Sequence, residues 1–477
     1  MPVPTFHLRC ALGALLLALR GAGAEPVLAL EEAVQAALAH NRSLRLLELS
    51  LESSVLGVAQ ARTEFSVRLR PEGEVAADDE GGQSGAGLGV SKKQGVGTSL
   101  SVDGRWTRTG FDESPDLHRG VVQVEVRQPL LRRFGRLVNE EPVVQARSGV
   151  QASRREVELW RTDLVVQVVE GYEEILRLQR QLEFDEQALR RSGQLLRLTR
   201  AREQQGRATR VDALRVDLQH GENQIRLNKT TEDIEIARAA FAELLGREPG
   251  AEIVVTNTPL LEIAIPGRDE AVGLALSNRL DYAQVLADSR DAERGVRIAR
   301  RNLLPDLELI ARYERSGEGS RSSDSFDLDE DAWFVGLAAD TDLRRQDERL
   351  ALGQAMLRGE SARQTIEIVR SGLQRQVQTV LASYERARRE TLFAERNYRL
   401  AESRARLARR MFEIGKGDNF TVTDAENALL EARNRMLMSQ AEVTIAAYRM
   451  LRTLGTLMDY PADLKPEPDG AAGGGRP

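Results

Sequence analysis

The stretch FEIGKGDNFTVTDAENAL, residues 412–429, interrupts a long helical pattern and then lets the pattern resume. Gly415 and Gly417 permit the backbone to reverse direction, because glycine adopts left-handed conformations without steric cost. Asp418 and Asn419 are residue types that favour entry into a new helix. The stretch therefore predicts the tip of an αα-hairpin, with one helix arriving and a second helix leaving beside it.

The periodicity on both sides of this tip predicts close packing of the two helices. Two positions recur every seven residues in each arm, and one of the two is kept small. The seams are Tyr384, Thr391, Tyr398, Ala405 and Phe412 with Ala387, Ala394, Ala401 and Ala408 before the tip, and Ala425, Ala432, Ser439, Ala446 and Thr453 with Leu429, Met436, Val443, Met450 and Leu457 after it. Such heptads are typical of coiled-coil packing, and the small residues allow neighbouring helices to approach closely.

The chain is predicted to be an internal duplication. EEAVQAALAHN at 31–41 matches DEAVGLALSNR at 269–279, an offset of 238 residues. Further on, Tyr172 and Tyr384 are 212 apart, so the main length difference lies between about residue 70 and residue 172. Each half has the order helix, β-segment, very long helix, tip, helix.

We expect four segments in the whole chain. They are a signal peptide at 1–24, a first structural repeat at 25–257, a second structural repeat at 258–460 and a disordered tail at 461–477. The expected helices are 30–64, 139–204 and 208–246 in the first repeat and 268–303, 346–412 and 420–457 in the second. The expected β-segments are about 66–130 and about 305–343, and the Gly-rich piece near residues 81–97 is a candidate for an additional strand pair.

The β-segments alternate apolar and polar residues over about ten positions, which suits the wall of a membrane β-barrel. Two or three hairpins cannot close a barrel with a lumen, so several copies must share one barrel. The fold class is therefore mainly α with a β-barrel part, in which duplicated antiparallel helical hairpins form an α-barrel joined to a shared transmembrane β-barrel. The alternative is a small soluble β-subdomain on a periplasmic coiled coil.

The composition and the short motifs exclude several classes of function. Arg9, the apolar run after it and the small residues Ala22 and Ala24 predict a cleaved secretory signal. Cys10 lies inside that signal, so the mature chain has no cysteine for disulfides, zinc-thiolate sites or thiol catalysis. With 67 basic and 73 acidic residues interspersed, nothing indicates nucleic-acid binding. His40, His118 and His220 match no metal or catalytic spacing, and we expect no enzyme activity, no metal and no cofactor.

Together these features resemble the TolC-like outer-membrane efflux channel family over nearly the whole mature chain. Besides the duplication, the matching pieces are VRQPLLRRFGR at 126–136, RRNLLPDLEL at 300–309 and the tip pattern of Gly415, Asp424 and Ala425. The resemblance implies a homotrimer with about four strands per subunit in a shared twelve-strand barrel, and a periplasmic α-barrel. It also implies a passive exit duct of a tripartite efflux or type I secretion system in the bacterial outer membrane. Its partners would be a periplasmic adaptor and an inner-membrane pump or ABC exporter.

The resemblance also assigns candidate sites. They are the periplasmic tips for adaptor docking (Gly206, Gly415, Gly417, Asp418, Asn419), a pore constriction (Asp424, Asp212), the barrel–helix junctions (Pro129, Pro305) and the membrane interface (Trp106, Trp333). Two departures stand out: Asp342 replaces a common proline, and Thr421 replaces the second acidic residue of the constriction.

The alternatives remain open at this stage. Asp424 has an equally good interpretation as an ordinary acidic residue near a helix N-terminus, and the two tryptophans as packed strand residues. The rival to the duct as a whole is a periplasmic or cell-surface coiled-coil structural protein without a pore.

Overall fold

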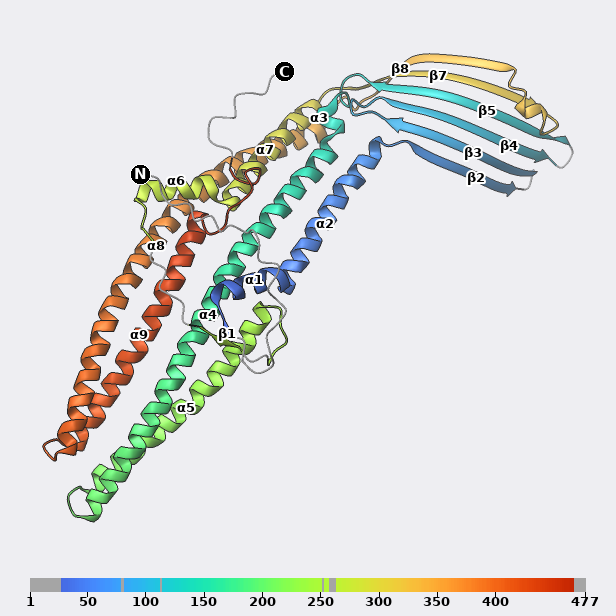
Figure 1. Cartoon of the computed structure of the whole chain (residues 1–477). Helices are drawn as coiled ribbons and strands as arrows, with labels where there is room; N and C mark the ends of the chain where they lie inside the picture. The colour runs from blue at the N-terminus through green and yellow to red at the C-terminus, as the bar shows by residue number, and fades with distance from the viewer. Residues whose placement is uncertain (1–26, 79–80, 112–113, 251–252, 257–262, 467–477) are drawn as a thin grey trace, which may run out of the picture. The chain divides into compact units, whose positions relative to one another are not determined.

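The computed structural model describes residues 27–78, 81–111, 114–250, 253–256 and 263–466 (Figure 1). The predicted signal peptide and the residues after 466 lie outside the described residues. The predicted tail starts too early at 461, because the side chain of Leu464 is buried against Leu280 and Tyr460. The ordered chain therefore continues past residue 460.

Four long helices make the predicted hairpins. They are α4 (Glu141–Gln204), α5 (Arg210–Leu244), α8 (Gln346–Glu413) and α9 (Asn419–Leu454). Their ends agree with the predicted ends within three residues. The glycines placed at the turns explain this, because Gly206 and Gly415 both adopt positive φ, of 69° and 76°.

The two remaining predicted helices are wrong as single elements, because each is divided in two. The pieces are α1 (Leu30–His40) and α2 (Arg42–Arg62) in the first half and α6 (Arg268–Asn278) and α7 (Leu280–Arg301) in the second. The breaks fall at Asn41 and Arg279, whose backbones are extended. Asn41 uses the break to donate its side-chain amide to the carbonyl of Leu244, 3.0 Å away at the end of α5.

Six antiparallel strands form one sheet in the order β2-β3-β4-β5-β7-β8. Their bounds are β2 (Arg68–Asp78), β3 (Gly81–Lys93), β4 (Ser99–Phe111), β5 (Ser114–Pro129), β7 (Asp306–Gly319) and β8 (Glu330–Asp340). Figure 1 shows β2 and β8 at the two edges of the sheet. The four strands implied by the family resemblance are therefore corrected to six. The Gly-rich piece supplies β3, which forms the additional hairpin with β2 from the segment before it.

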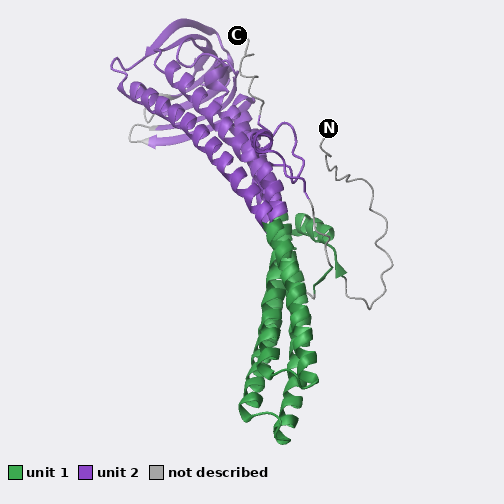
Figure 2. Ribbon diagram, turned by 90° about the vertical axis from the view of Figure 1, so that its left-hand side faces the viewer, with its two compact units in different colours: residues 1–41, 164–262, 387–445 green, residues 42–163, 263–386, 446–477 purple. Residues whose placement is uncertain are grey.

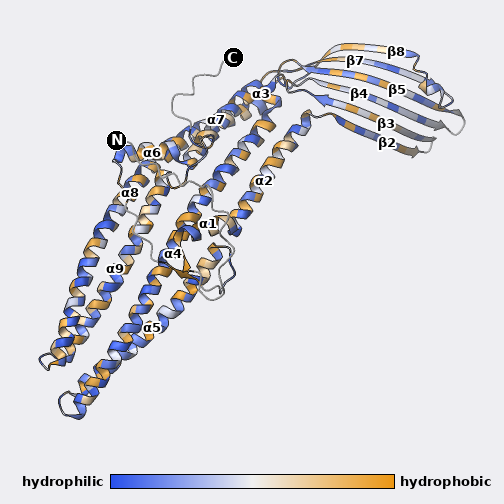
Figure 3. Cartoon of the chain, in the orientation of Figure 1, coloured by the Kyte–Doolittle hydropathy of each residue, from blue (hydrophilic) through white to orange (hydrophobic). Residues whose placement is uncertain are grey.

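The sheet has one apolar and one charged face, because directly paired residues point to the same side. The exposed apolar residues that share a face are Leu69, Val75, Leu88, Leu100, Val102, Val122, Val126, Leu309, Tyr313, Trp333, Val335 and Leu337. Figure 3 shows the resulting alternation along the strands. A wide, exposed apolar face requires cover by another surface or by lipid.

A buried tyrosine of the first half that contacts the backbone through its hydroxyl has a counterpart in the second half. Tyr172 is fully buried and its hydroxyl contacts the carbonyls of Leu28 (3.0 Å) and Thr256 (2.8 Å), which belong to or follow the short strands β1 (Val27–Leu28) and β6 (Val254–Val255). Tyr384 is also buried, and its hydroxyl accepts from the backbone N–H of Ile263 at 3.1 Å. These paired contacts support our proposal that 25–257 and 258–460 are structural repeats.

The chain divides into two compact units, and neither is a sequence half (Figure 2). Unit 1 comprises residues 1–41, 164–262 and 387–445. Unit 2 comprises residues 42–163, 263–386 and 446–477, and it contains the sheet. Both halves of the sequence therefore contribute to both units.

Candidate functional site

The first hairpin tip, between α4 and α5, is closed by a capping box. The Thr209 hydroxyl donates to the Asp212 carboxylate at 2.6 Å and accepts from the Asp212 backbone N–H at 3.2 Å. These bonds to Thr209 hold the pKa of Asp212 below its usual range, with a smaller contribution from the charge of Arg215. Asp212 therefore fixes the start of α5 and carries a full negative charge at neutral pH.

The second tip, between α8 and α9, turns at Gly415 and Gly417. The Asp418 carboxylate accepts from the backbone N–H of Thr421 at 2.8 Å, which is the N-cap role expected from its residue type. This bond to Thr421 also lowers the pKa of Asp418. Asn419 begins α9 and is largely buried.

The two tips contact each other within unit 1. The side-chain amide of Asn419 donates to the backbone carbonyl of Asp212 at 3.1 Å. The guanidinium of Arg202 lies 4.2 Å from the ring centre of Phe412 and donates to the Phe412 carbonyl at 3.1 Å. Arg215 lies 5.6 Å from the ring centre of Phe420. The structure thus joins Asn419 to Asp212, and we call the two touching turns, with Gly206 in the first and Gly415, Gly417 and Asp418 in the second, the double tip.

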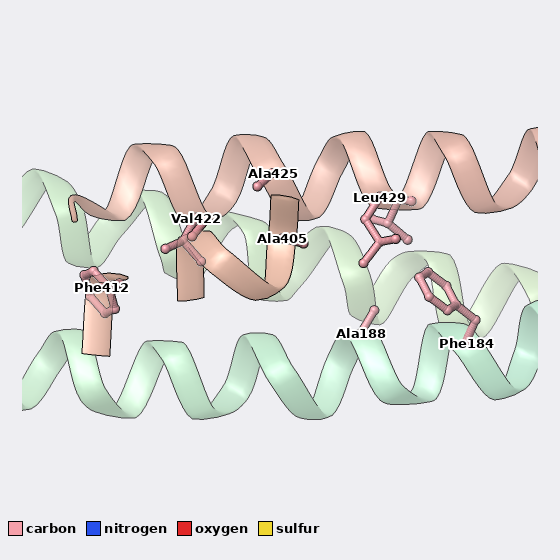
Figure 4. Close-up of a cluster of buried hydrophobic side chains, with 9 residues drawn as sticks. Phe184, Ala188, Ala405, Phe412, Val422, Ala425 and Leu429 are labelled. Atoms are coloured by element: carbon pink, nitrogen blue, oxygen red, sulfur yellow. The ribbon is translucent and has the colours of Figure 1, made fainter. Parts of the chain in front are cut away.

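A tight hydrophobic cluster supports the double tip (Figure 4). It joins Phe184 and Ala188 of α4 to residues of α8 and α9, among them Ala405 and Ala425, which are fully buried. Ala405, Ala408 and Ala425 of the predicted seams are all buried in this cluster. Close packing of this kind fixes the position of the tips relative to the rest of their helices.

Asp424 lies one turn beyond the second tip and remains exposed. It forms an ion pair with Arg404 of α8. The structure does not bring Asp424 into contact with Asp212, whose own partners are Thr209 and Arg215. Sequence patterns missed Arg404, because the pair connects two arms of a hairpin across 20 residues.

The charged face of the sheet carries ion pairs between strands. Glu125 of β5 is buried and accepts from Arg312 of β7 at 2.7 Å. Nearer the β2 edge of the same sheet, Arg105 of β4 donates to Glu72 of β2 at 2.8 Å, reaching across Gly87 of β3. This face therefore combines polarity with side-chain order, as the lining of an aqueous channel would.

The predicted junction and interface residues lie at the ends and on the apolar face of the sheet. Pro129 ends β5, and the carbonyl of Pro305, next to β7, accepts from the N–H of Arg132 at 3.3 Å. Trp106 on β4 stacks on His118 with ring centres 5.6 Å apart, and Trp333 on β8 is 77% exposed. Both tryptophans are on the apolar face, the placement that an interfacial aromatic residue requires.

Among the residues that the structure describes, no three His, Cys, Asp or Glu side chains are grouped to hold a metal ion. No helix in the described part of the chain is both long and apolar enough to cross a membrane.

Comparison with known proteins identifies the class. The model of the outer membrane efflux protein family matches residues 33–247 and 271–456, so the chain belongs to this family. It is therefore an efflux channel protein of the outer membrane, of the TolC-like type. The two matched segments correspond to the two halves of the sequence.

Solved structures share the fold. The outer-membrane channel OprN matches with a TM-score of 0.71 at 16% identity, over 89% of each chain. VceC from Vibrio cholerae matches with a TM-score of 0.70 at 19% identity, over 89% of this chain and 96% of that one. The CmeC channel of Campylobacter jejuni matches with a TM-score of 0.71 at 13% identity, over 91% and 87%. No curated protein sequence matches the chain.

Proposed function

We propose that three copies of the chain assemble into a passive exit duct that crosses the outer membrane and extends into the periplasm. A periplasmic adaptor would connect the duct to an inner-membrane pump or ABC exporter, which supplies the energy. The observation that carries this proposal is the six-stranded sheet, with an exposed apolar face, a charged face and two open edges. Six strands are too few to close around a lumen, so the sheet must be completed by other copies.

Exposed apolar residues on the long helices also favour assembly. Val211, Leu218 and Ile225 of α5 recur every seven residues and are each more than 60% exposed. Phe393, Leu400 and Leu407 of α8 have the same spacing and similar exposure. Heptads exposed on two helices of one chain are suited to pair with each other between neighbouring copies.

Changing Leu400 and Leu407 together to glutamine is expected to prevent stable trimer formation. Each leucine buried between copies contributes about 1.5–3 kcal/mol, and each trimer contains three such interfaces. Trimers are measured by size-exclusion chromatography with light scattering in detergent. The matched control changes the exposed neighbours Arg399 and Arg406 to glutamine and leaves the trimer intact. Normal trimers from the leucine variant would show that this stripe is not the contact between copies.

The channel itself is tested with the unaltered protein. Detergent extraction of outer membranes is expected to give heat-modifiable trimers that produce discrete conductance steps in planar bilayers. A wholly soluble product without conductance would instead favour the rival, a periplasmic or cell-surface coiled-coil protein without a pore.

The double tip is the proposed docking surface for the adaptor. Because Cys10 in the predicted signal peptide is the one cysteine of the sequence, single cysteines at the exposed positions Gly206 or Asp418 can carry a cross-linker without a competing thiol once that peptide is removed. Trapping an adaptor in cells from these positions, but not from a position on α2, would support docking at the tips.

Asp424 is the proposed constriction residue. Three copies would place three carboxylates round the mouth, which would attract cations. Because Arg404 offsets this charge, Asp424→Asn is expected to weaken block by divalent cations several-fold and Arg404→Gln to strengthen it. Single-channel recordings measure both effects. Identical block in the two variants would remove Asp424 from the conduction path.

A further inference from the structure

We propose that the barrel of the assembled channel has eighteen strands, six from each of three copies, with β2 of one copy paired to β8 of the next. The proposal rests on the trimeric channel proposed above. It adds the number of strands, the seam between copies and a pore wider than twelve strands would enclose.

The hairpin β2–β3 is part of the same wall as the other four strands. Leu69 of β2 pairs with Val90 of β3, and Val90 pairs with Val102 of β4, so the apolar face continues without interruption. Leu69 is 69% exposed and Val75 is 88% exposed. Side chains of this kind are stable only when the hairpin faces the same lipid as its neighbours.

The opposite face of the hairpin is continuous as well. The ion pair between Glu72 and Arg105 spans β2, β3 and β4 on the charged side. It crosses β3 at Gly87, where a Cβ atom would lie 3.1 Å from the backbone carbonyl of Gly104. The hairpin therefore has the two-sided character of a barrel wall.

The two edges of the sheet are suited to each other. β2 and β8 each contain 11 residues. β2 follows α2 and leads away from the helices, whereas β8 leads back toward α8, so the two strands run in opposite directions. When copies are related by rotation, β8 of one and β2 of the next are then antiparallel and present the same face outward. Such head-to-tail contacts close into a ring.

A ring that excluded β2 and β3 would have to use β4 as its edge. β3 pairs with β4 along 13 residues, from Gly81 opposite Phe111 to Lys93 opposite Ser99. A twelve-strand ring would break this whole ladder or leave the apolar hairpin in water. The diameter of a barrel grows roughly linearly with strand number, so eighteen strands give a barrel about 1.5 times as wide as twelve.

Cysteine cross-linking distinguishes a barrel in which β8 pairs with β2 of the next copy from one in which β8 pairs with β4. One cysteine replaces Gly73 on β2 or Gly104 on β4, two positions where an added Cβ meets no atom within 4 Å. The second cysteine is placed in turn at Trp333, Val335 and Leu337 on β8, so that alternative registers are sampled. The full-length trimers are oxidised in outer membranes and analysed by denaturing electrophoresis. Each single-cysteine protein is the control.

We expect disulfide-linked copies with Gly73→Cys and at least one β8 partner, and none with Gly104→Cys. Cross-linking from Gly104→Cys, or intact trimers with no cross-link from Gly73→Cys, would overturn the eighteen-strand barrel and leave the trimeric channel standing. Absence of trimers would instead contradict the proposed function.

Deletion of the hairpin is the second measurement. Removing residues 68–93 joins Val67 to Gln94, and the cut ends are neighbours because Arg68 pairs directly with Ser91. The variant is expected to form trimers with a barrel about one third narrower. Electron cryomicroscopy would count the strands, and exclusion of polymers added from the outer side would give the pore size. An unchanged barrel diameter in the deletion variant would overturn the proposal.

Discussion

Phe241→Ala is expected to lower the stability of the folded chain by about 3–5 kcal/mol, the usual cost of removing a buried aromatic ring. Phe241 is 1% exposed and meets the ring of Tyr172 edge-on, with centres 6.3 Å apart. Tyr172 in turn contacts the carbonyls of Leu28 and Thr256 through its hydroxyl. A cavity at Phe241 would therefore loosen the connection between α4, α5 and the short β1–β6 sheet. The midpoint of thermal loss of far-ultraviolet circular dichroism is expected to fall by several degrees.

The second half of the chain supplies the control for this prediction. The position 209 residues after Phe241 is Met450, which is also fully buried. The residue before the buried tyrosine is Gly171 in the first half, before Tyr172, and Ser383 in the second half, before Tyr384. A Cβ at Gly171 would lie 2.8 Å from the Phe241 ring. Phe241→Met should thus cost less than Phe241→Ala and should make Gly171→Ala tolerable. If Gly171→Ala lowered the thermal midpoint equally in the wild type and in Phe241→Met, the proposed contact between position 171 and the Phe241 ring would be wrong.

Glu173→Gln is expected to make the protein more stable at neutral and alkaline pH and to flatten its pH dependence. Burial raises the pKa of Glu173 to about 7, and the charge of Arg180 and a hydrogen bond from Thr444 offset this only in part. The side chain is 6% exposed on α4. Its folded pKa exceeds the ordinary glutamate value of 4.5, so the folded chain binds more protons than the unfolded chain at any pH between 4.5 and about 7.

The sign of the effect follows from this difference. The contribution of Glu173 to the free energy of unfolding is fully present below about pH 4.5. It is lost as the pH rises through about 7, which lowers the free energy of unfolding by about 3 kcal/mol per chain. Thermal midpoints of the wild type and Glu173→Gln should agree at about pH 4.5 and separate above about pH 7. The adjacent, exposed Glu174, which pairs with Arg177, is the control: Glu174→Gln should keep the wild-type slope. A wild-type slope in Glu173→Gln would exclude Glu173 as its source.

Local chemistry explains which parts of the fold were predictable. Gly206 and Gly415 end their helices by adopting positive φ, and glycine is the residue type that does so without steric cost. The breaks at Asn41 and Arg279 were not predictable, because one extended residue hardly disturbs the helical spacing of its neighbours. What stabilises the break at Asn41 is a bond to Leu244, more than two hundred residues away.

In the candidate site, too, some features were predictable from residue type and others depend on distant contacts. Capping by Asp418 was predictable from its residue type, whereas the contact of Asn419 with Asp212 depends on how two hairpins meet. Glu173 and Glu174 are identical neighbours in sequence, yet one is buried and the other exposed. Such differences arise from packing between helices and leave no mark in the local pattern.

The mixing of both sequence halves in each compact unit has a consequence for biogenesis. Unit 1 needs residues up to 445, and in the sheet Val124 of β5 pairs with Tyr313 of β7, 189 residues later. Neither unit can therefore be completed while the chain is still emerging from the export machinery. Contacts so distant in sequence form slowly and leave strand edges exposed in the meantime. We expect the exported chain to depend on periplasmic holdase chaperones until its last helix has arrived, and a chain truncated after the first repeat to be degraded rather than inserted.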